Sequence, residues 1–189
     1  MEHVEVVTAV GRFEDAATLV GTSRPDAGAC WCMSYRDARL ANAERPAALR
    51  DLCSVPPGPG VLAYVDGEPA GWCSVAPRSS YRRLVRSRTI PTLDDRDAWA
   101  VVCFVVRPGY RRRGLLHELL DGAVAHARAH GAEVVEGYPV DAADGRVDSV
   151  AGYVGSVQLF ERAGFVRVSA TTAHSARRVR WVVRRELGT

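Results

Sequence analysis

The stretch Cys103-Phe-Val-Val-Arg-Pro-Gly-Tyr-Arg-Arg-Arg-Gly-Leu-Leu-His117 joins an apolar, β-branched segment to a helix-forming one through a turn at Pro108 and Gly109. The first backbone N–H groups of a helix have no partner within the helix, and the helix dipole adds partial positive charge there. Gly114 lets a ligand approach the backbone closely, and the three arginines before it pair well with phosphate. The stretch therefore predicts a pyrophosphate-binding loop between a strand and a helix.

Apolar periodicity and turn residues divide the rest of the chain into further strands and helices. Strands are expected at residues 3–10, 61–65, 70–76, 98–106, 134–140, 165–170 and 178–185, and helices at 13–20, 42–53, 115–130 and 155–163, with a short surface helix at 80–88. Asp66-Gly67 predicts a hairpin, and Asn42 is a candidate helix cap. Residues 98–106 are apolar on both faces, which favours a central strand. The order of the main elements is βααβββαβαββ.

Two segments of the chain resemble motifs of one known family. Val106-Arg-Pro-Gly-Tyr-Arg-Arg-Arg-Gly-Leu-Leu116 resembles the acetyl-CoA loop of the GNAT superfamily of N-acetyltransferases. Leu159-Phe-Glu-Arg-Ala-Gly-Phe165 resembles the end of that family's fourth helix. The element order is also that of the family. The resemblance implies an α/β fold (an α+β mixed sheet) as a single domain over residues 1–189, with the central sheet splayed between strands 4 and 5.

The same resemblance implies acetyl-CoA as co-substrate. Backbone groups of Phe104, Val105 and Val106 would pair with the pantetheine arm, the N–H groups of residues 112–116 would hold the pyrophosphate, and the N–H of Val105 would stabilise the oxyanion. The implied cofactor-binding residues are Phe104, Val105, Val106, Arg111, Arg112, Arg113, Gly114, Leu115, Leu116 and Phe160. Leu116 departs from the pattern, since the family has a small residue there.

The implied reaction is direct attack of a primary amine, of a small molecule or of a peptide or protein, on the thioester. A protonated amine must lose its proton, and Glu136 on the fifth expected strand is the candidate base, with an exposed or ion-paired carboxylate as the alternative. Phe160 replaces the tyrosine that usually serves as general acid. Tyr153 is the catalytic residue expected in its place, with Tyr138 as a second candidate and simple packing as the alternative for both. Asp95, Asp97 and Asp141 are weaker candidates for the base and would line an acidic entrance.

Two other groups of residues invite different chemistry. Cys30-Trp-Cys-Met33 lacks the second ligand pair of a zinc site, so we expect buried cysteines that shape the acceptor pocket and no metal. Cys103 has no neighbouring His to activate it and is interpreted as a packing residue. Arg-rich stretches at 78–88 and 177–185 alternate with core residues, which favours a solvated face or an oligomer edge over nucleic acid.

The amino-acid composition indicates the kind of source genome and the expected cellular location. All 25 basic residues are Arg, which together with abundant Ala, Gly and Val is typical of a GC-rich bacterial genome, and the net charge is only +3. Five cysteines without a framework-like spacing suit a reducing interior, so a cytoplasmic location is expected. The chain has no apolar run of membrane-spanning length, and its N-terminus does not read as a signal peptide. The edges of the last strands suggest a homodimer.

Two further functions stay open at this point. Phe160 could mark a catalytically degenerate member that senses acyl-CoA without turnover. The arginine clusters could mark a nucleic-acid-binding regulator.

Overall fold

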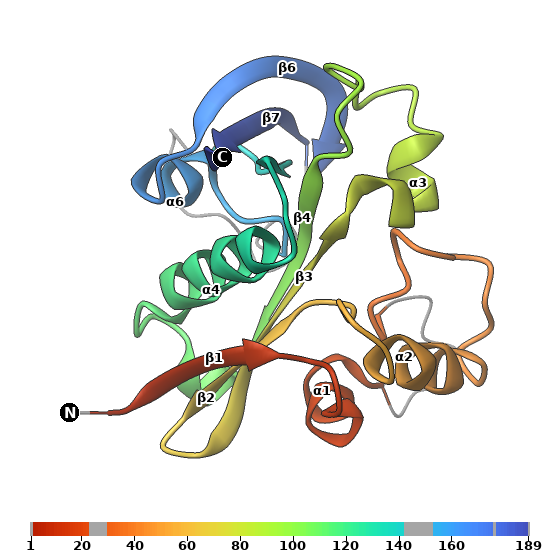
Figure 1. The fold of residues 1–189 in the computed structure, drawn as a ribbon, viewed down its shortest axis with the longest axis vertical. Coiled ribbons are helices and arrows are strands. Elements are labelled where there is room, and N and C mark those ends of the chain that lie inside the picture. Colours follow the sequence, from red (N-terminus) through yellow and green to blue (C-terminus); the bar gives the residue numbers. More distant parts are fainter. Residues whose placement is uncertain (1, 23–29, 142–152, 176, 189) are drawn as a thin grey trace.

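Seven strands of the described chain form one mixed sheet in the order β1-β2-β3-β4-β5-β7-β6 (Figure 1). The structure is a computed structural model that describes residues 2–22, 30–141, 153–175 and 177–188. The strands are β1 (Val4–Thr8), β2 (Val61–Val65), β3 (Glu68–Pro77), β4 (Trp99–Val106), β5 (Val134–Gly137), β6 (Val166–Ser175) and β7 (Arg178–Glu186). The helices are α1 (Phe13–Val20), α2 (Arg45–Cys53), α3 (Arg82–Val85), α4 (Leu115–Ala129) and α6 (Val157–Arg162), with single turns η1 (Arg78–Ser80) and η2 (Pro108–Tyr110). Neighbouring strands are antiparallel except β4 and β5.

Helices cover both faces of the sheet because its strands are apolar on both faces. In β2, Val61 and Ala63 join the core cluster that holds the apolar stripe of α4, with Leu119 and Leu120. Leu62, between them, joins the opposite cluster with the buried side chains of α1 and α2. This alternation follows from the pleat, which sends successive side chains to opposite faces. α4 therefore lies on one face and α1 with α2 on the other (Figure 1).

A bulge in β4 opens the sheet. Ser74 pairs with Cys103 and the next residue, Val75, pairs with Val101, so Val102 is an extra residue in β4. An extra residue bends the strand that carries it. β5 pairs with β4 only from Trp99 to Val101. Beyond Val101, β4 keeps β3 as its partner strand, which confirms the expected splay between the fourth and fifth strands.

The main expectations for the fold are confirmed, with differences at element ends. α2 begins at Arg45 with Pro46 in its first turn, and Asn42 is not its N-cap. The surface helix expected at 80–88 is limited to η1 and α3. β5 ends at Gly137 instead of continuing to Val140, because Pro139 has no N–H to donate and Val140 bridges to Ser156 and Arg180. The hairpin turn at Asp66 and Gly67 is present, both residues having positive φ angles.

The remaining expectations concern the surface. None of the helices in the described ranges is long and apolar enough to cross a membrane. β6 is the edge strand at one side of the sheet, and its Val166 and Val168 are exposed. The homodimer suggested by this edge stays a prediction.

Candidate active site

A pocket of about 740 Å³ lies where the splayed end of β4 meets the start of α4 and the side of α6. We call it the β4–α4 pocket. It is lined by Phe104, Val105, Val106, Tyr110, Arg111, Arg112, Gly114, Leu115, Leu116, His117, Tyr153, Ser156, Gln158, Leu159 and Arg162. The strand end of the lining is apolar and the loop end is basic. None of these described lining residues is acidic, so the pocket is suited to an elongated ligand with an apolar arm and an anionic group.

The backbone at the start of α4 forms an anion site. Gly114 occupies the N-cap position with φ +82°, and no side chain caps this end of the helix. Arg112 also has a positive φ, +63°, a conformation that costs a non-glycine residue about 1 kcal/mol. No described residue accepts a hydrogen bond from the backbone N–H groups of residues 112–116. Arg112, Gly114, Leu115 and Leu116 line the pocket, so N–H donors without a described partner and the positive end of the helix dipole lie beside it, which is the condition for binding phosphate.

The three arginines of the loop separate in space. Arg111 and Arg112 line the pocket, and Arg111 Nε donates to the carbonyl of Val106 at 3.1 Å. Arg113 is not part of the lining, because its Nη1 bonds Glu2 Oε1 at 2.7 Å and its guanidinium lies over the Tyr110 ring. The Arg113 side chain, which was expected to contact the cofactor, therefore lies outside the pocket.

Leu116, an expected cofactor-binding residue where the family has a small one, is partly buried against the core and lines the pocket. Other lining residues were not expected from the sequence. α6 adds Gln158 and Arg162, which lie four residues apart and therefore share one helix face. That spacing was the signal available in the sequence. Tyr110, His117 and Ser156 complete the unexpected polar lining.

The backbone of β4 decides which N–H groups face the splay. The N–H of Phe104 donates to the carbonyl of Tyr153 at 2.7 Å, on the side away from β3, whereas the N–H of Arg107 donates to Ala70 next to β3. Because the N–H groups of successive strand residues alternate in direction, the N–H of Val106 points toward the splay and the N–H of Val105, the expected oxyanion donor, points toward β3.

Tyr153 is the expected catalytic residue that the structure brings to the pocket. Its carbonyl accepts the hydrogen bond from the N–H of Phe104 in β4. Its side chain, like that of Cys103, packs against the cluster that contains Tyr35 and Tyr138, on the face of the sheet opposite α4. Burial raises the pKa of the Tyr153 hydroxyl, and the adjacent Tyr35 adds to the rise. The hydroxyl is therefore protonated at neutral pH.

Glu136, the expected base, lies outside the β4–α4 pocket. It is 1% exposed and pairs in the sheet register with Ala100, four residues before Phe104. Arg184 donates to its Oε1 from Nε at 3.1 Å, and the Tyr138 hydroxyl donates to its Oε2 at 2.8 Å. Arg78 Nε lies 3.8 Å from the same carboxylate. The ion-paired alternative describes this environment, and a catalytic role for Glu136 stays a prediction without support from the geometry.

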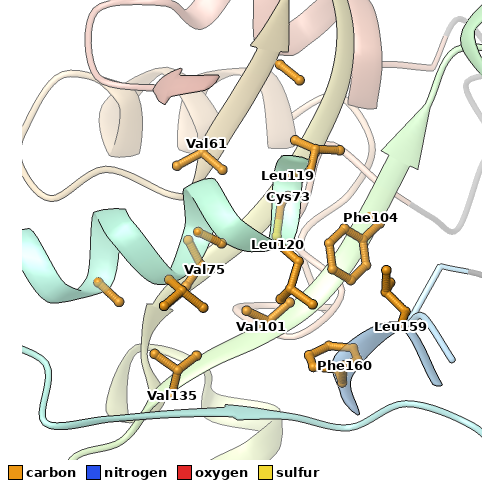
Figure 2. Packing of buried hydrophobic residues seen from close by; sticks show 14 of the residues in the cluster. Val61, Cys73, Val75, Val101, Phe104, Leu119, Leu120, Val135, Leu159 and Phe160 are labelled. Carbon is orange, nitrogen blue, oxygen red and sulfur yellow. The ribbon is translucent and has the colours of Figure 1, made fainter. Parts of the chain in front are cut away.

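Phe160 is fully buried and does not line the pocket. Its ring packs edge-on against Phe104 and Phe165, with centroids 6.2 and 5.0 Å apart (Figure 2). A Cβ on Gly137 would lie 2.2 Å from the Phe160 ring, so this glycine makes room for it. The expected contact of Phe160 with the cofactor is replaced by a role in the core.

The cysteines show hydrogen bonding and packing. All five are free, and no group of three or more His, Cys, Asp or Glu side chains in the described ranges could hold a metal. The Trp72 indole donates to Cys32 Sγ at 3.1 Å. A hydrogen bond from Cys103 lowers the pKa of Cys30 to about 6. Cys30 is thus the most reactive thiol to be expected among those described.

The expected acidic entrance is also absent from the lining. Asp97 accepts hydrogen bonds from the N–H and hydroxyl of Ser79, and Asp141 pairs with Arg167 at 2.7 Å. Asp95 is not part of the described lining either. Basic and neutral side chains surround the cavity instead.

Comparison with known proteins agrees with this architecture. Residues 26–165 match the acetyltransferase (GNAT) family. No curated protein sequence matches the chain. A GNAT-family acetyltransferase of Streptococcus pneumoniae is 18% identical, with a TM-score of 0.57 over 98% of this chain and 100% of that one. A mosquito arylalkylamine N-acetyltransferase-like protein is 14% identical, with a TM-score of 0.59 over 98% and 100%.

A third similar structure is a putative acetyltransferase of Salmonella typhimurium described with its cofactor acetyl-CoA. It is 15% identical, with a TM-score of 0.56 over 97% of this chain and 94% of that one. At these identities the structural likeness establishes the fold, and the sequence match covers most of the chain. The splayed strand, the anion site at the start of α4 and the family match lead to one conclusion: this chain belongs to the GNAT family of acetyltransferases.

Proposed function

We propose that the protein transfers an acetyl group from acetyl-CoA to a primary amine by direct attack. The observation that carries the proposal is the row of unpartnered N–H groups at residues 112–116, at the basic end of a pocket whose other end is apolar. This arrangement fits the pyrophosphate and pantetheine of acetyl-CoA. Acetyl-CoA would supply the activated acyl group as a thioester.

Different residues along the pocket would bind the pyrophosphate, stabilise the oxyanion and exclude water. The N–H groups of residues 112–116 bind pyrophosphate oxygens, with Arg111, Arg112 and Arg162 adding positive charge. Val106 offers its N–H to a carbonyl oxygen at the splay, where negative charge develops during attack. The ring of Phe104 and the side chain of Leu159 exclude water beside it (Figure 2).

Tyr153 would complete the proton balance. The amine nitrogen forms a C–N bond to the acyl carbon, the C–S bond breaks, the nitrogen loses a proton and the sulfur gains one. Because burial raises the pKa of Tyr153, its hydroxyl is protonated at neutral pH and can supply that proton to the leaving thiolate. The proton that the amine loses then restores the hydroxyl.

Calorimetric titration with acetyl-CoA and CoA release with a panel of primary amines test the proposal. CoA should be quantified by chromatography, because a thiol reagent would also react with Cys30. We expect micromolar binding and CoA release with at least one amine. Binding without release across a broad panel would favour an acyl-CoA sensor, and absence of binding would refute the proposal.

A further inference from the structure

A second, smaller pocket of about 220 Å³ is lined in part by Tyr35, whose side chain interacts with Tyr153. We call it the Arg180 pocket. It is lined by Tyr35, Arg83, Leu84, Ser87, Thr89, Ile90, Thr172, Ala173, His174 and Arg180. The lining contains two arginines, a histidine and four hydroxyl side chains, and none of its described members is acidic. Its chemistry suits a small anion.

Arg180 is the buried cation of this pocket. It is 5% exposed, donates from Nε to the Tyr138 carbonyl at 2.7 Å and donates from Nη1 to the Tyr35 hydroxyl at 2.6 Å. Its guanidinium also lies 5.8 and 5.9 Å from the centroids of the Tyr35 and Tyr138 rings. Its Nη2 is buried without a hydrogen-bond partner. All these described partners are neutral.

The contrast with Arg184 shows what Arg180 lacks. The two arginines lie four residues apart on β7, so their side chains leave the same face of the sheet. Arg184 is similarly buried, but it pairs with Glu136 and with Asp94. A buried guanidinium stays charged, and burying a charge without an opposite one is costly. An anionic group from outside the protein would remove that cost at Arg180.

The position of the pocket connects it to the reaction. Tyr35 lines the Arg180 pocket, Tyr153 lines the β4–α4 pocket, and the two side chains interact. The positive charge of Arg180 also acts on Tyr153, where it works to lower the pKa of the hydroxyl. A molecule held by Arg180 would therefore extend toward the splay of β4 from the face opposite α4.

We propose that the acceptor amine also carries a carboxylate, which binds in the Arg180 pocket, where Arg83 contributes charge at the rim and the buried guanidinium of Arg180 supplies the positive charge to be neutralised. This inference rests on the proposed acetyl transfer. A carboxylate fits better than a phosphate because Nε and Nη1 of Arg180 already donate to protein partners, so Arg180 offers one positive charge and few free donors, whereas a phosphate carries up to two negative charges. The small volume suits the anionic end of an amino-acid-like molecule.

The test compares amines with and without the carboxylate. Glycine, β-alanine and 5-aminopentanoate vary the distance between the two groups, and phenylalanine is paired with phenethylamine; phosphoethanolamine supplies the phosphate arm. Variants Arg180→Gln and Arg180→Lys remove or displace the fork, and Arg83→Ala acts at the exposed rim. Arg86→Ala is the matched control, because Arg86 is exposed on the same segment and does not line the pocket.

We expect carboxylate-bearing amines to be preferred over their neutral counterparts. Arg180→Gln should lower kcat/KM for them about 10- to 100-fold through KM and should affect neutral amines less, whereas Arg86→Ala should leave both classes of amine and the acetyl-CoA affinity unchanged. Arg83→Ala should give a smaller effect in the same direction, and it remains informative if Arg180→Gln does not fold. Equal use of neutral amines, or a preference for phosphoethanolamine, would overturn the carboxylate assignment.

A direct binding measurement separates this inference from the proposed function. N-acetylglycine is titrated into the protein with and without CoA. Binding that Arg180→Gln abolishes and Arg86→Ala retains supports the anion site even if no amine is acetylated. If N-acetylglycine does not bind in either condition, the anion site is refuted, whether or not acetyl-CoA binds.

Discussion

Arg184 of β7 donates from both Nε and Nη2 to a single oxygen of Glu136 on β5, and both side chains are buried. The two residues are cross-strand partners in the sheet register. Glu136 also accepts the Tyr138 hydroxyl and lies beside Arg78. Its oxygens are thus occupied by a network that joins β5, β7 and the turn after β3.

The first prediction concerns Glu136→Gln. Removing the negative charge leaves Arg184 and Arg78 with less compensation in the core, so the free energy of unfolding should fall by about 3 kcal/mol in urea titrations. Glu186→Gln, which breaks an exposed pair with Arg96, should cost less than about 1 kcal/mol and is the control. If Glu136→Gln instead removed the acidic limb of the kcat/KM profile at unchanged stability, Glu136 would be the base.

The second prediction concerns Tyr153→Phe. Loss of the hydroxyl removes the proposed proton donor, so kcat should fall about 100-fold or more, while the dissociation constant for acetyl-CoA changes little. Steady-state kinetics and calorimetry measure the two quantities. Phe160→Tyr, which restores the hydroxyl at the family's usual position, should not rescue the variant because Phe160 lies in the core. Recovery of kcat in the double variant would contradict the assignment.

The third prediction compares two glycines of the loop. Gly114 has φ +82°, whereas Gly109 has no such constraint, and an added Cβ meets nothing within 4 Å at either position. Gly114→Ala should therefore cost about 1 kcal/mol from backbone strain alone and turn the N–H groups of the loop away from the phosphate. Acetyl-CoA affinity should fall for Gly114→Ala and stay unchanged for Gly109→Ala. Equal affinities in calorimetry would show that the anion site lies elsewhere.

The fourth prediction concerns acid stability and His126. Burial lowers the pKa of His126 from 6.5 to about 4, with His130 close by at 4.4 Å between ring centroids. Between those two pH values the unfolded chain binds a proton that the folded protein excludes, so stability falls as pH drops from 6.5 to 4. His126→Gln should flatten this part of the curve in urea titrations, and the exposed His3→Gln should leave it intact. A curve unchanged by His126→Gln would mean that other groups carry the acid sensitivity.

Local features of the chain were predictable because they depend on residues close in sequence. The loop before α4 and the hairpin at Asp66-Gly67 need only the conformational preferences of glycine and proline. The same stretch supplies much of the lining of the β4–α4 pocket. The differences arise where a side chain contacts a residue far away in the sequence. The Phe160 ring fills the space beside Gly137, and the Arg113 guanidinium pairs with Glu2.

The sequence by itself determined the order of the elements and, through its resemblance to the family, predicted the splayed sheet and a candidate anion site at the start of α4. Only the tertiary structure decided which charges are neutralised. Pairing of β5 with β7 places Glu136 against Arg184, while the hydrogen-bond partners of the Arg180 side chain among the described residues, Tyr35 and Tyr138, are neutral. No local pattern separates these two arginines, because their difference arises from side chains that meet only after the sheet has formed.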